Sequence, residues 1–357
     1  MKILLLGEYS GLHNNLKGGL QELGHDVTLA ASGDGFKKFP ADIIFDSDKK
    51  GFVGKVERHL KYFLNLKKMT GYDMVQLINP IVFNPKLGIN NFLLDFIIKN
   101  NDKVSLLGAG CDAFFWQKTR YKLKYGPFDD NLKYDYSSDK NPYYDSSKSL
   151  EWNTKLAKKV DHIIPIMYEY QIGYEGYENL RACIPIPMNT KKIKYQENFI
   201  KDKLVVFHGL NRYGFKGTRI VEDAFSELQK KYPNDLELLI KGNMPIDKYL
   251  DVMNRTNVVI DQVYSHSCGM NAIYALAMGK VVLGGAEPES LHALNIDSTP
   301  VINIKPDKFS IIKQIEFLLK NKERIHEMGM DSRSFVETYH CDVDVADNYL
   351  KTWSLSK

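Results

Sequence analysis

Cysteine is scarce in this sequence, and the few cysteines present are scattered. They are Cys111, Cys183, Cys268 and Cys341, and no C-x-x-C pair occurs. Zinc ribbons and dithiol redox sites need cysteines at close spacing, so neither class of site is predicted. Isolated cysteines are typical of a reducing compartment, and we expect a cytoplasmic protein with reduced thiols.

Long apolar runs are also lacking. The run at the N-terminus, Ile3–Leu6, is too short for the hydrophobic core of a signal peptide. No stretch approaches the roughly 20 apolar residues that a membrane-spanning helix needs. We therefore expect no membrane span, while peripheral contact with a membrane surface stays open.

Neither sign of charge dominates the chain. The 48 lysines and arginines exceed the 44 acidic residues by only four, which gives little support to a nucleic-acid partner. The 357 residues are enough for two domains of ordinary size. We expect a globular protein of two domains that binds no nucleic acid.

Short apolar strands alternate with amphipathic helices along the whole chain. The predicted strands are Ile3–Leu6, one within 24–32, Asp73–Ile78, Val104–Leu107, His162–Met167, Leu204–Phe207, Leu236–Ile240, Val258–Ile260, Lys280–Gly285 and Val301–Ile304. The predicted helices are Leu16–Leu23, Glu57–Leu66, Leu87–Lys99, Leu150–Val160 with Ser149 as N-cap, Arg219–Tyr232, Ile246–Arg255, Met270–Met278, 308–320 and 323–338. This alternation indicates an α/β fold with parallel sheets.

The chain divides near two prolines, Pro185 and Pro187, which interrupt the segment after the last strand of the first half. The predicted units are a first domain at 1–187, a linker at 188–202, a second domain at 203–340 and a C-terminal segment at 341–357. The last of these units contains an amphipathic stretch, Val343–Leu355.

One strand–loop–helix–strand unit in the second half has the features of a ligand site. After Val258–Ile260 come a loop and a small-residue helix, which Gly279 is placed to cap in the left-handed conformation. In open parallel sheets, ligands bind at the loops that follow the carboxyl ends of the strands. The start of this helix, Gly269–Asn271, also presents free N–H groups and a positive dipole end, which suit an anion such as a diphosphate.

A second loop supplies two cations. Arg212 and Lys216 follow the strand Leu204–Phe207 and have glycines around them. Glycines let the backbone approach a ligand closely. The cations together can neutralise a diphosphate, arginine in bidentate fashion and lysine as a point charge. The alternative is a basic loop that only caps the following helix.

Residues 115–148 contain few aliphatic side chains and many tyrosines. The tyrosines are Tyr121, Tyr125, Tyr134, Tyr136, Tyr143 and Tyr144, interspersed with Lys, Asp and Ser. This pattern predicts a long surface insertion. Aromatic rings beside hydrogen-bonding groups suit a carbohydrate acceptor, and a packed tyrosine-rich loop is the alternative. The aspartates disfavour stacking on single-stranded nucleic acid.

The segment 257–285 resembles the donor-site signature of glycosyltransferases with the GT-B fold, mainly the retaining family 4. That signature has two glutamates separated by seven residues, then a small-residue helix ending in glycine, then a β run. The matching residues are Ala272, Ala275, Ala277, Gly279, Lys280, Val281 and Val282. His266 and Tyr274 stand where the family has its glutamates. The resemblance implies two Rossmann-like domains facing a cleft, with the C-terminal helix crossing back to the first.

The resemblance also implies roles for particular residues. Arg212, Lys216, Gly269, Met270 and Asn271 would bind the donor diphosphate, Gly242 and Asn243 would face the base, His266 would meet the donor sugar and Tyr274 the ribose. Alternatively, Tyr274 belongs to the core and His266 points to solvent. Glu287 and Glu289 are candidates to replace a missing glutamate, or are exposed turn acids. No metal or other cofactor is implied, because the cationic groups replace it.

Two residues of the first half have alternative interpretations. Asp112 lies where the family has a loop beside the reaction centre, and it would orient or deprotonate an acceptor hydroxyl or cap the next helix. His13 follows Gly7 and Gly11, which do not form the G-x-G-x-x-G fingerprint of dinucleotide sites. It is either an acceptor-site residue or a solvated loop histidine.

These features predict a metal-independent glycosyltransferase, hexosyl-transferring and retaining, that uses a nucleotide-diphosphate sugar such as a UDP- or GDP-sugar. The acceptor would be a carbohydrate or a lipid-linked molecule in polysaccharide or glycoconjugate synthesis. Two other hypotheses share the fold. One is a sugar-nucleotide epimerase, with Asp112, Glu287 and Glu289 as its candidate carboxylates, and the other is a non-catalytic sugar-nucleotide binder.

Overall fold

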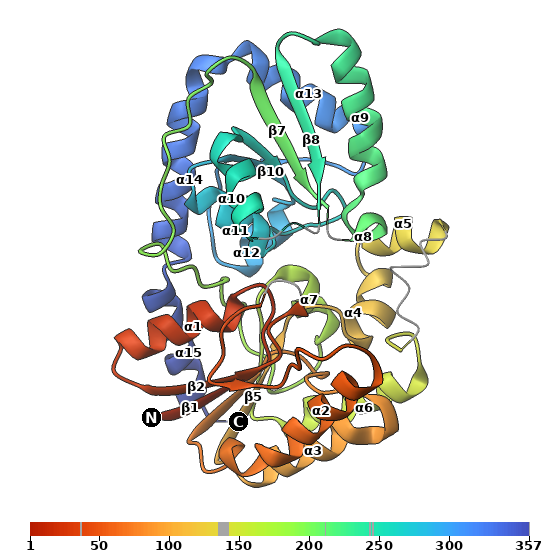
Figure 1. Cartoon of the computed structure of the whole chain (residues 1–357), viewed down its shortest axis with the longest axis vertical. Helices are drawn as coiled ribbons and strands as arrows, with labels where there is room; N and C mark the ends of the chain where they lie inside the picture. The colour runs from red at the N-terminus through yellow and green to blue at the C-terminus, as the bar shows by residue number, and fades with distance from the viewer. Residues whose placement is uncertain (36–37, 135–142, 211, 243, 245, 357) are drawn as a thin grey trace.

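Two parallel β-sheets, each accompanied by helices, form a lower and an upper lobe in Figure 1. The computed structural model describes residues 1–35, 38–134, 143–210, 212–242, 244 and 246–356. Strands before residue 166 build the first sheet, and strands after residue 203 build the second. We call the two lobes the first and the second domain.

The first sheet has the strand order β3-β2-β1-β4-β5-β6. Its strands are β1 (Lys2–Leu6), β2 (Asp26–Ala31), β3 (Ile43–Ile44), β4 (Met74–Leu77), β5 (Lys103–Gly108) and β6 (His162–Pro165). Every pair is parallel, and Leu4 of β1 is opposite Thr28 of β2 and Val75 of β4. Runs of Ile, Leu and Val fit this sheet, because parallel strands are covered on both faces.

The second sheet has the order β11-β10-β9-β7-β8 and is again parallel. Its strands are β7 (Leu204–Gly209), β8 (Leu236–Lys241), β9 (Val258–Ile260), β10 (Val281–Gly284) and β11 (Ile302–Asn303). The strands predicted in the second half of the chain are all present. Gly279, before β10, has a φ of 82°, as predicted for a left-handed helix cap.

Helices connect the strands. Those before β7 are α1 (Leu12–Glu22), α2 (Gly51–Leu64), α3 (Ile89–Lys99), α4 (Ala113–Gln117), α5 (Pro127–Lys133), α6 (Ser147–Lys159) and α7 (Tyr168–Gly173). Those after β7 are α8 (Tyr213–Lys216), α9 (Thr218–Lys231), α10 (Ile246–Arg255), α11 (Met270–Ala277), α12 (Pro288–Ala293), α13 (Lys308–Lys320), α14 (Ile325–Tyr339) and α15 (Asp342–Ser354). Within the described residues, no helix combines the length and the apolar content that crossing a bilayer requires.

The last helix, α15, leaves the second domain and packs against α1 of the first (Figure 1). Tyr349 and Trp353 on α15 are buried, and the Trp353 indole N–H donates to Oε1 of Gln76 on β4 at 3.1 Å. The two helices touch at Gly19, where a Cβ would lie 2.0 Å from the carbonyl oxygen of Asp342. The predicted return of the C-terminal helix is confirmed.

Helix starts differ from the prediction. Helix α1 begins at Leu12 rather than Leu16, and α2 at Gly51 rather than Glu57. The N-cap of α6 is Ser146, whose Oγ accepts from the N–H of Ser149 at 3.2 Å, so the predicted cap was wrong. Two serines three residues apart can both cap a helix, and the sequence does not show where the backbone turns.

The expected surface insertion at 115–148 is largely packed in its described part. Phe115, Trp116 and Phe128 are buried together. Helix α5 lies against α8 of the second domain (Figure 1). Burial raises the pKa of the Tyr144 phenol above its usual value, and Tyr121 is exposed. For much of the segment the surface prediction was therefore wrong and the packed-loop alternative is confirmed, and 135–142, with Tyr136, lie outside the described residues.

Candidate functional site

Loops after β7, β8, β9 and β10 meet at one edge of the second sheet. Parallel strands end on the same side, and the arrows of β7 and β8 in Figure 1 point toward the first domain. These loops carry Arg212, Lys216, Gly242, His266, Gly269 and Glu287. The fold thus gathers the predicted residues of the second half, of which Asn243 lies outside the described residues.

A buried carboxylate, Asp261, lies at the centre of this edge and is 2% exposed. Nζ of Lys216 is 3.5 Å from Oδ1 of Asp261. The N–H of Gly269 and the side-chain amide of Asn271 both donate to this carboxylate at 3.3 Å. Lys216 and the start of α11 therefore converge on one point. Asp261 was not among the predicted site residues, although its place directly after a strand was an available signal.

Arg212 reaches toward the first domain. Its Nη1 donates to Sγ of Cys111 at 3.5 Å, and its guanidinium lies 3.8 Å above the Phe215 ring. Cys111 belongs to the loop after β5, so the arginine joins the two domains. Burial raises the pKa of the Cys111 thiol despite the nearby positive charge, which keeps this thiol neutral at pH 7.

Glycines let neighbouring loops touch through their backbones. A Cβ on Gly242 would lie 1.5 Å from the carbonyl oxygen of Leu210, and one on Gly285 would lie 2.2 Å from that of Ser265. Any side chain at either position would push two loops apart. Contact of Gly242 and Asn243 with a nucleotide base stays a prediction.

His266 is enclosed by aromatic rings and is 2% exposed. The Tyr125 ring stacks on the imidazole with centroids 4.5 Å apart. The Tyr168 ring is tilted toward it, with centroids 5.8 Å apart. Among the described residues, neither ring nitrogen has a hydrogen-bond partner. A solvent-facing His266 was therefore a wrong alternative. Two buried nitrogens without partners favour a polar ligand, and contact with a donor sugar stays a prediction.

Tyr274 on α11 is half-buried rather than a fully buried core residue. Its ring lies 6.3 Å from that of Tyr249 on α10, and the Tyr249 hydroxyl donates to Oδ1 of Asn271 at 2.8 Å. Helices α10 and α11 thus share a polar contact beside Asp261. Met270, next to Asn271, is partly buried and packs against the hydrophobic core cluster that includes Ile273 and Met278. A ribose contact of Tyr274 stays a prediction.

Glu287 is buried, 4% exposed, so its interpretation as an exposed turn acid was wrong. The hydroxyl of Tyr125 donates to it at 2.5 Å and the amide of Asn303 at 3.0 Å, and Lys305 pairs with it. Burial alone would raise the pKa of Glu287, but these donors outweigh burial and lower it to about 2. The neighbouring Glu289 pairs with Lys124 at 3.1 Å.

A glutamate that the sequence analysis did not single out links the domains. Glu169 on α7 is 3% exposed, and its Oε1 accepts from the N–H groups of His266 and Ser267 at 2.8 and 2.9 Å. The hydroxyls of Ser265 and Ser267 donate to the same carboxylate at 2.9 and 2.5 Å. The first domain therefore holds the loop before α11 through one buried carboxylate.

Asp112 is 1% exposed and caps α4, accepting from the N–H of Phe115 at 2.7 Å and from the Tyr174 hydroxyl at 2.5 Å. The capping interpretation is confirmed, and a catalytic role stays a prediction. Burial raises the pKa of this carboxyl, although the two hydrogen bonds oppose the shift.

His13 is fully buried, so a solvated histidine was the wrong alternative. Its Nδ1–H donates to the carbonyl oxygen of Gly7 at 2.7 Å. Burial lowers the pKa of His13 to about 4, so the ring is neutral at pH 7. This histidine supports the turn between β1 and α1.

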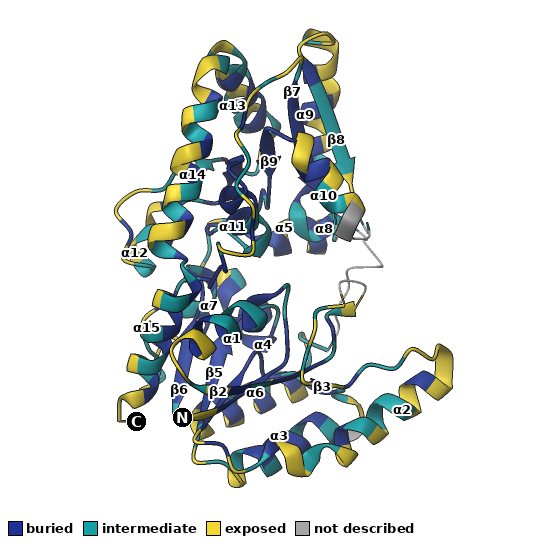
Figure 2. Cartoon of the chain, turned by 60° about the vertical axis from the view of Figure 1, so that its left-hand side comes forward, coloured by how far each residue is buried: buried dark blue, intermediate teal, exposed yellow. Residues whose placement is uncertain are grey.

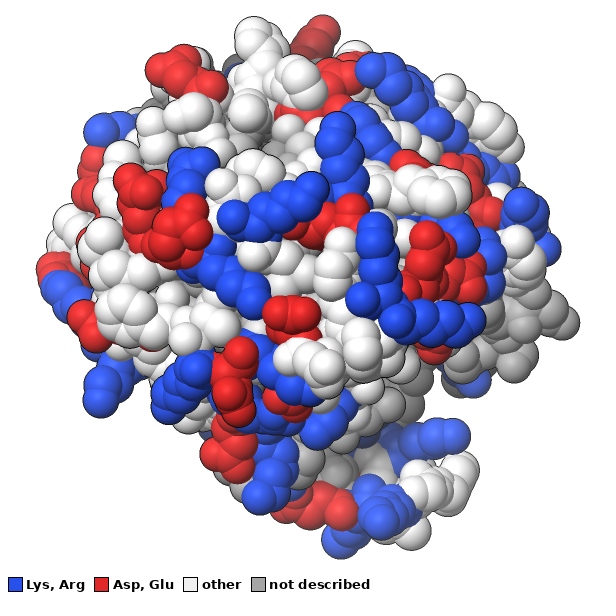
Figure 3. Space-filling view, turned by 90° about the horizontal axis from the view of Figure 1, so that it is seen from above, with Lys and Arg blue, Asp and Glu red and all other residues white. Residues whose placement is uncertain are grey.

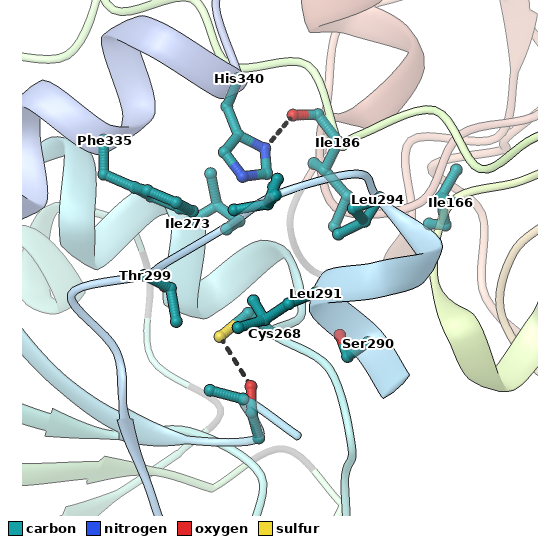
Figure 4. A pocket seen from close by; sticks show the side chains of 13 residues that line it. Ile166, Ile186, Cys268, Ile273, Ser290, Leu291, Leu294, Thr299, Phe335 and His340 are labelled. Carbon is teal, nitrogen blue, oxygen red and sulfur yellow. Dashed lines mark hydrogen bonds between the residues drawn. The ribbon is translucent and has the colours of Figure 1, made fainter. Parts of the chain in front are cut away.

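A cavity of about 30 Å³ lies behind the loop before α11 (Figure 4). Mainly apolar side chains line it, with Cys268 on one side and His340 on the other. The Cys268 thiol donates to the carbonyl oxygen of Gly285 at 3.2 Å, and Nδ1 of His340 donates to that of Ile186 at 2.8 Å. This volume is about that of one water molecule, so the cavity is no nucleotide site.

Comparison with known proteins bears on the fold. No protein-family model and no curated protein sequence matches this chain. Solved structures do match. HepE of Anabaena in complex with UDP and glucose is 13% identical over 99% of both chains, with a TM-score of 0.65. Sucrose-phosphate synthase from Thermosynechococcus elongatus is 14% identical over 99% of this chain and 98% of that one, with a TM-score of 0.63.

A third similar structure is UDP-GlcNAc 2-epimerase from Neisseria meningitidis bound to UDP-GlcNAc. It is 11% identical over 99% of both chains, with a TM-score of 0.53. Together with the two parallel-sheet domains and the returning helix α15, these likenesses show that the chain has the GT-B fold. The predicted fold class is confirmed. One fold hosts several activities, so the fold alone does not define the function.

Proposed function

We propose that the protein is a glycosyltransferase that moves a sugar from a nucleotide-diphosphate sugar to a hydroxyl acceptor. The observation that carries this proposal is the convergence of Lys216 and the start of α11 on Asp261 at the edge of the second sheet, with Arg212 on the same loop as Lys216. A diphosphate needs cations and N–H donors at one point. HepE, of the same fold, was crystallised with UDP and with UDP-glucose, which supports a nucleotide sugar as the donor.

The groups at this edge suit the departure of a nucleoside diphosphate from the donor sugar. A leaving nucleoside diphosphate develops negative charge, and Lys216, Arg212 and the N–H groups at Gly269–Asn271 would stabilise it. The enclosed His266, with both ring nitrogens available, would hold a sugar hydroxyl. Glu287 has the depressed pKa of a carboxylate that stays charged and accepts hydrogen bonds. Retention of configuration and transfer of a hexose belong to the proposal through the resemblance to family 4.

The acceptor would be a carbohydrate or a lipid-linked molecule in polysaccharide or glycoconjugate synthesis, and the protein would work in the cytoplasm. Nucleic acid is not a proposed partner. On the face shown in Figure 3, positive and negative side chains alternate, whereas a nucleic-acid surface gathers positive charge.

A sugar-nucleotide epimerase is the second candidate, because a UDP-GlcNAc 2-epimerase shares the fold. Calorimetric titration with UDP and GDP identifies the base. Turnover of the matching nucleotide sugars, with and without acceptor sugars, then separates the candidates. Transfer only in the presence of acceptor supports the proposal. Epimerised donor without acceptor supports the epimerase, and binding without turnover supports a non-catalytic binder.

We expect the transfer to persist after removal of divalent cations. Lys216, Arg212 and the α11 N–H groups supply the positive charge that Mg²⁺ provides in metal-dependent transferases. The measurement is the transfer rate after dialysis against EDTA, with and without added Mg²⁺ or Mn²⁺. A rate that vanishes in EDTA and returns with either cation contradicts metal independence while leaving the transferase proposal intact.

A further inference from the structure

Helix α2 carries its apolar residues on the side that faces solvent. The exposed ones are Phe52, Val53, Val56, Leu60, Phe63 and Leu64, with exposed fractions between 41% and 80%. On a helix of 3.6 residues per turn, these positions fall on one face. A soluble helix normally turns such a face inward, so this stripe indicates an interaction surface.

The opposite face of α2 fixes the helix to the first domain. Tyr62 is 3% exposed, and its ring lies 5.2 Å from that of Phe45 and 5.0 Å from that of Phe83. At Gly54 the backbone comes so close to the preceding turn that a Cβ would lie 1.9 Å from the carbonyl oxygen of Lys49. The apolar stripe therefore cannot turn inward without loss of these contacts.

The apolar surface continues onto α3. Phe92 of α3 is 59% exposed, and its ring lies 6.4 Å from that of Phe63. Figure 2 shows α2 and α3 one after the other along the lower side of the first domain, which is turned away from the second domain. The surface therefore lies away from the candidate functional site, and it is free to contact a partner while the cleft is in use.

Positive charge borders the stripe. Residues 49–68 contain seven lysines and arginines and a single acid, Glu57. Lys50 and Lys55 at one end and Lys67 and Lys68 at the other are exposed. Arg58 pairs with Asp46, and Lys49 and Lys61 pair with Glu57, so the four exposed lysines at the two ends carry the positive charge of this face. Apolar side chains flanked by lysines complement a bilayer whose headgroups are negative and whose interior is apolar.

We propose that the exposed face of α2, with Phe92, is a docking surface for an anionic phospholipid bilayer. The helix would lie in the plane of the interface, with Phe52, Leu60 and Leu64 inserted and the flanking lysines at the headgroups. The occupant is a membrane rather than a second copy, because two copies meeting through α2 would bring these lysines together. The inference does not depend on the proposed reaction.

The test is sedimentation of the full-length protein with vesicles. We expect binding to vesicles of phosphatidylcholine and phosphatidylglycerol in equal amounts, weak binding to phosphatidylcholine alone, and loss of binding at high salt. The variant Phe52→Ser/Leu60→Ser should reduce binding to the mixed vesicles about tenfold or more, because two inserted side chains are lost. The variant Lys67→Gln/Lys68→Gln should weaken binding to the mixed vesicles and leave the weak binding to phosphatidylcholine vesicles unchanged.

The control is Phe309→Ser, which removes another exposed phenylalanine, 65% exposed, from α13 of the second domain. It should leave vesicle binding unchanged. The inference is overturned if the wild-type protein does not bind mixed vesicles, or if Phe309→Ser weakens binding as much as the α2 variant. It is also overturned if analytical ultracentrifugation shows a dimer that Phe52→Ser/Leu60→Ser dissociates, because the face would then join two copies.

Discussion

Replacing Glu169 with alanine should lower the free energy of unfolding by roughly 3 kcal/mol or more, because four donors lose a buried charged acceptor. The donors are the N–H groups of His266 and Ser267 and the hydroxyls of Ser265 and Ser267. The loop before α11 would also lose its tie to the first domain. We expect faster hydrogen exchange at the His266 and Ser267 amides and weaker nucleotide binding. Denaturant titration and exchange mass spectrometry measure these effects.

Two variants separate this role from general damage. Glu169→Gln keeps an oxygen for the N–H groups of His266 and Ser267, and its amide can donate to the Ser267 hydroxyl, so it should cost much less than alanine. Glu175→Ala removes a nearby acid that is half-exposed and paired with Lys122, and it should change stability by about 1 kcal/mol or less. Equal losses for Glu169→Ala and Glu175→Ala would contradict the assigned role.

The strands of the second sheet were predictable because most of them are short runs of Ile, Val, Leu or Phe bounded by polar or glycine residues. Val258–Ile260 of β9 is such a run, and buried parallel strands need little else. The start of α2 was not predictable. Its apolar stripe faces solvent, so the usual rule that apolar residues mark the buried face does not apply to this helix. Only the packing of Tyr62 against Phe45 and Phe83 shows which side is inward.

The candidate site was predictable only where its residues follow strands. Arg212, Lys216 and the start of α11 were identified from their positions after β7 and β9. Glu169 also follows a strand, β6, but its role could not be predicted, because its partners lie about a hundred residues further along the chain and in the other domain. The enclosure of His266 likewise depends on Tyr125 and Tyr168 of the first domain. Contacts between domains are set by how two surfaces fit, which a single sequence does not display.

Replacing Lys216 with alanine should weaken binding of the nucleoside diphosphate by roughly 1.5–3 kcal/mol, about 10- to 150-fold in Kd, because one charge-assisted contact is lost. Arg212→Ala should have a similar effect. Calorimetric titration with UDP or GDP measures both. The control is Lys231→Ala at the C-terminal end of α9, which breaks a pair with Glu316 on α13 and should leave Kd unchanged. Unchanged dissociation constants for both site variants would remove the diphosphate from this loop.

Variants of Asp261 separate a loss of phosphate binding in Lys216→Ala from a loss of stability. Among the described residues, Lys216→Ala alone leaves the buried Asp261 carboxylate with the Gly269 and Asn271 donors and no cation, so it should also lower stability. The double variant Lys216→Ala/Asp261→Asn removes both charges and should recover most of the stability but none of the affinity. Asp261→Asn alone should bind the diphosphate at least as tightly as the wild type, because Lys216 then has no competing carboxylate. If the double variant recovers affinity together with stability, Lys216 supports the fold of the loop and does not bind the phosphates.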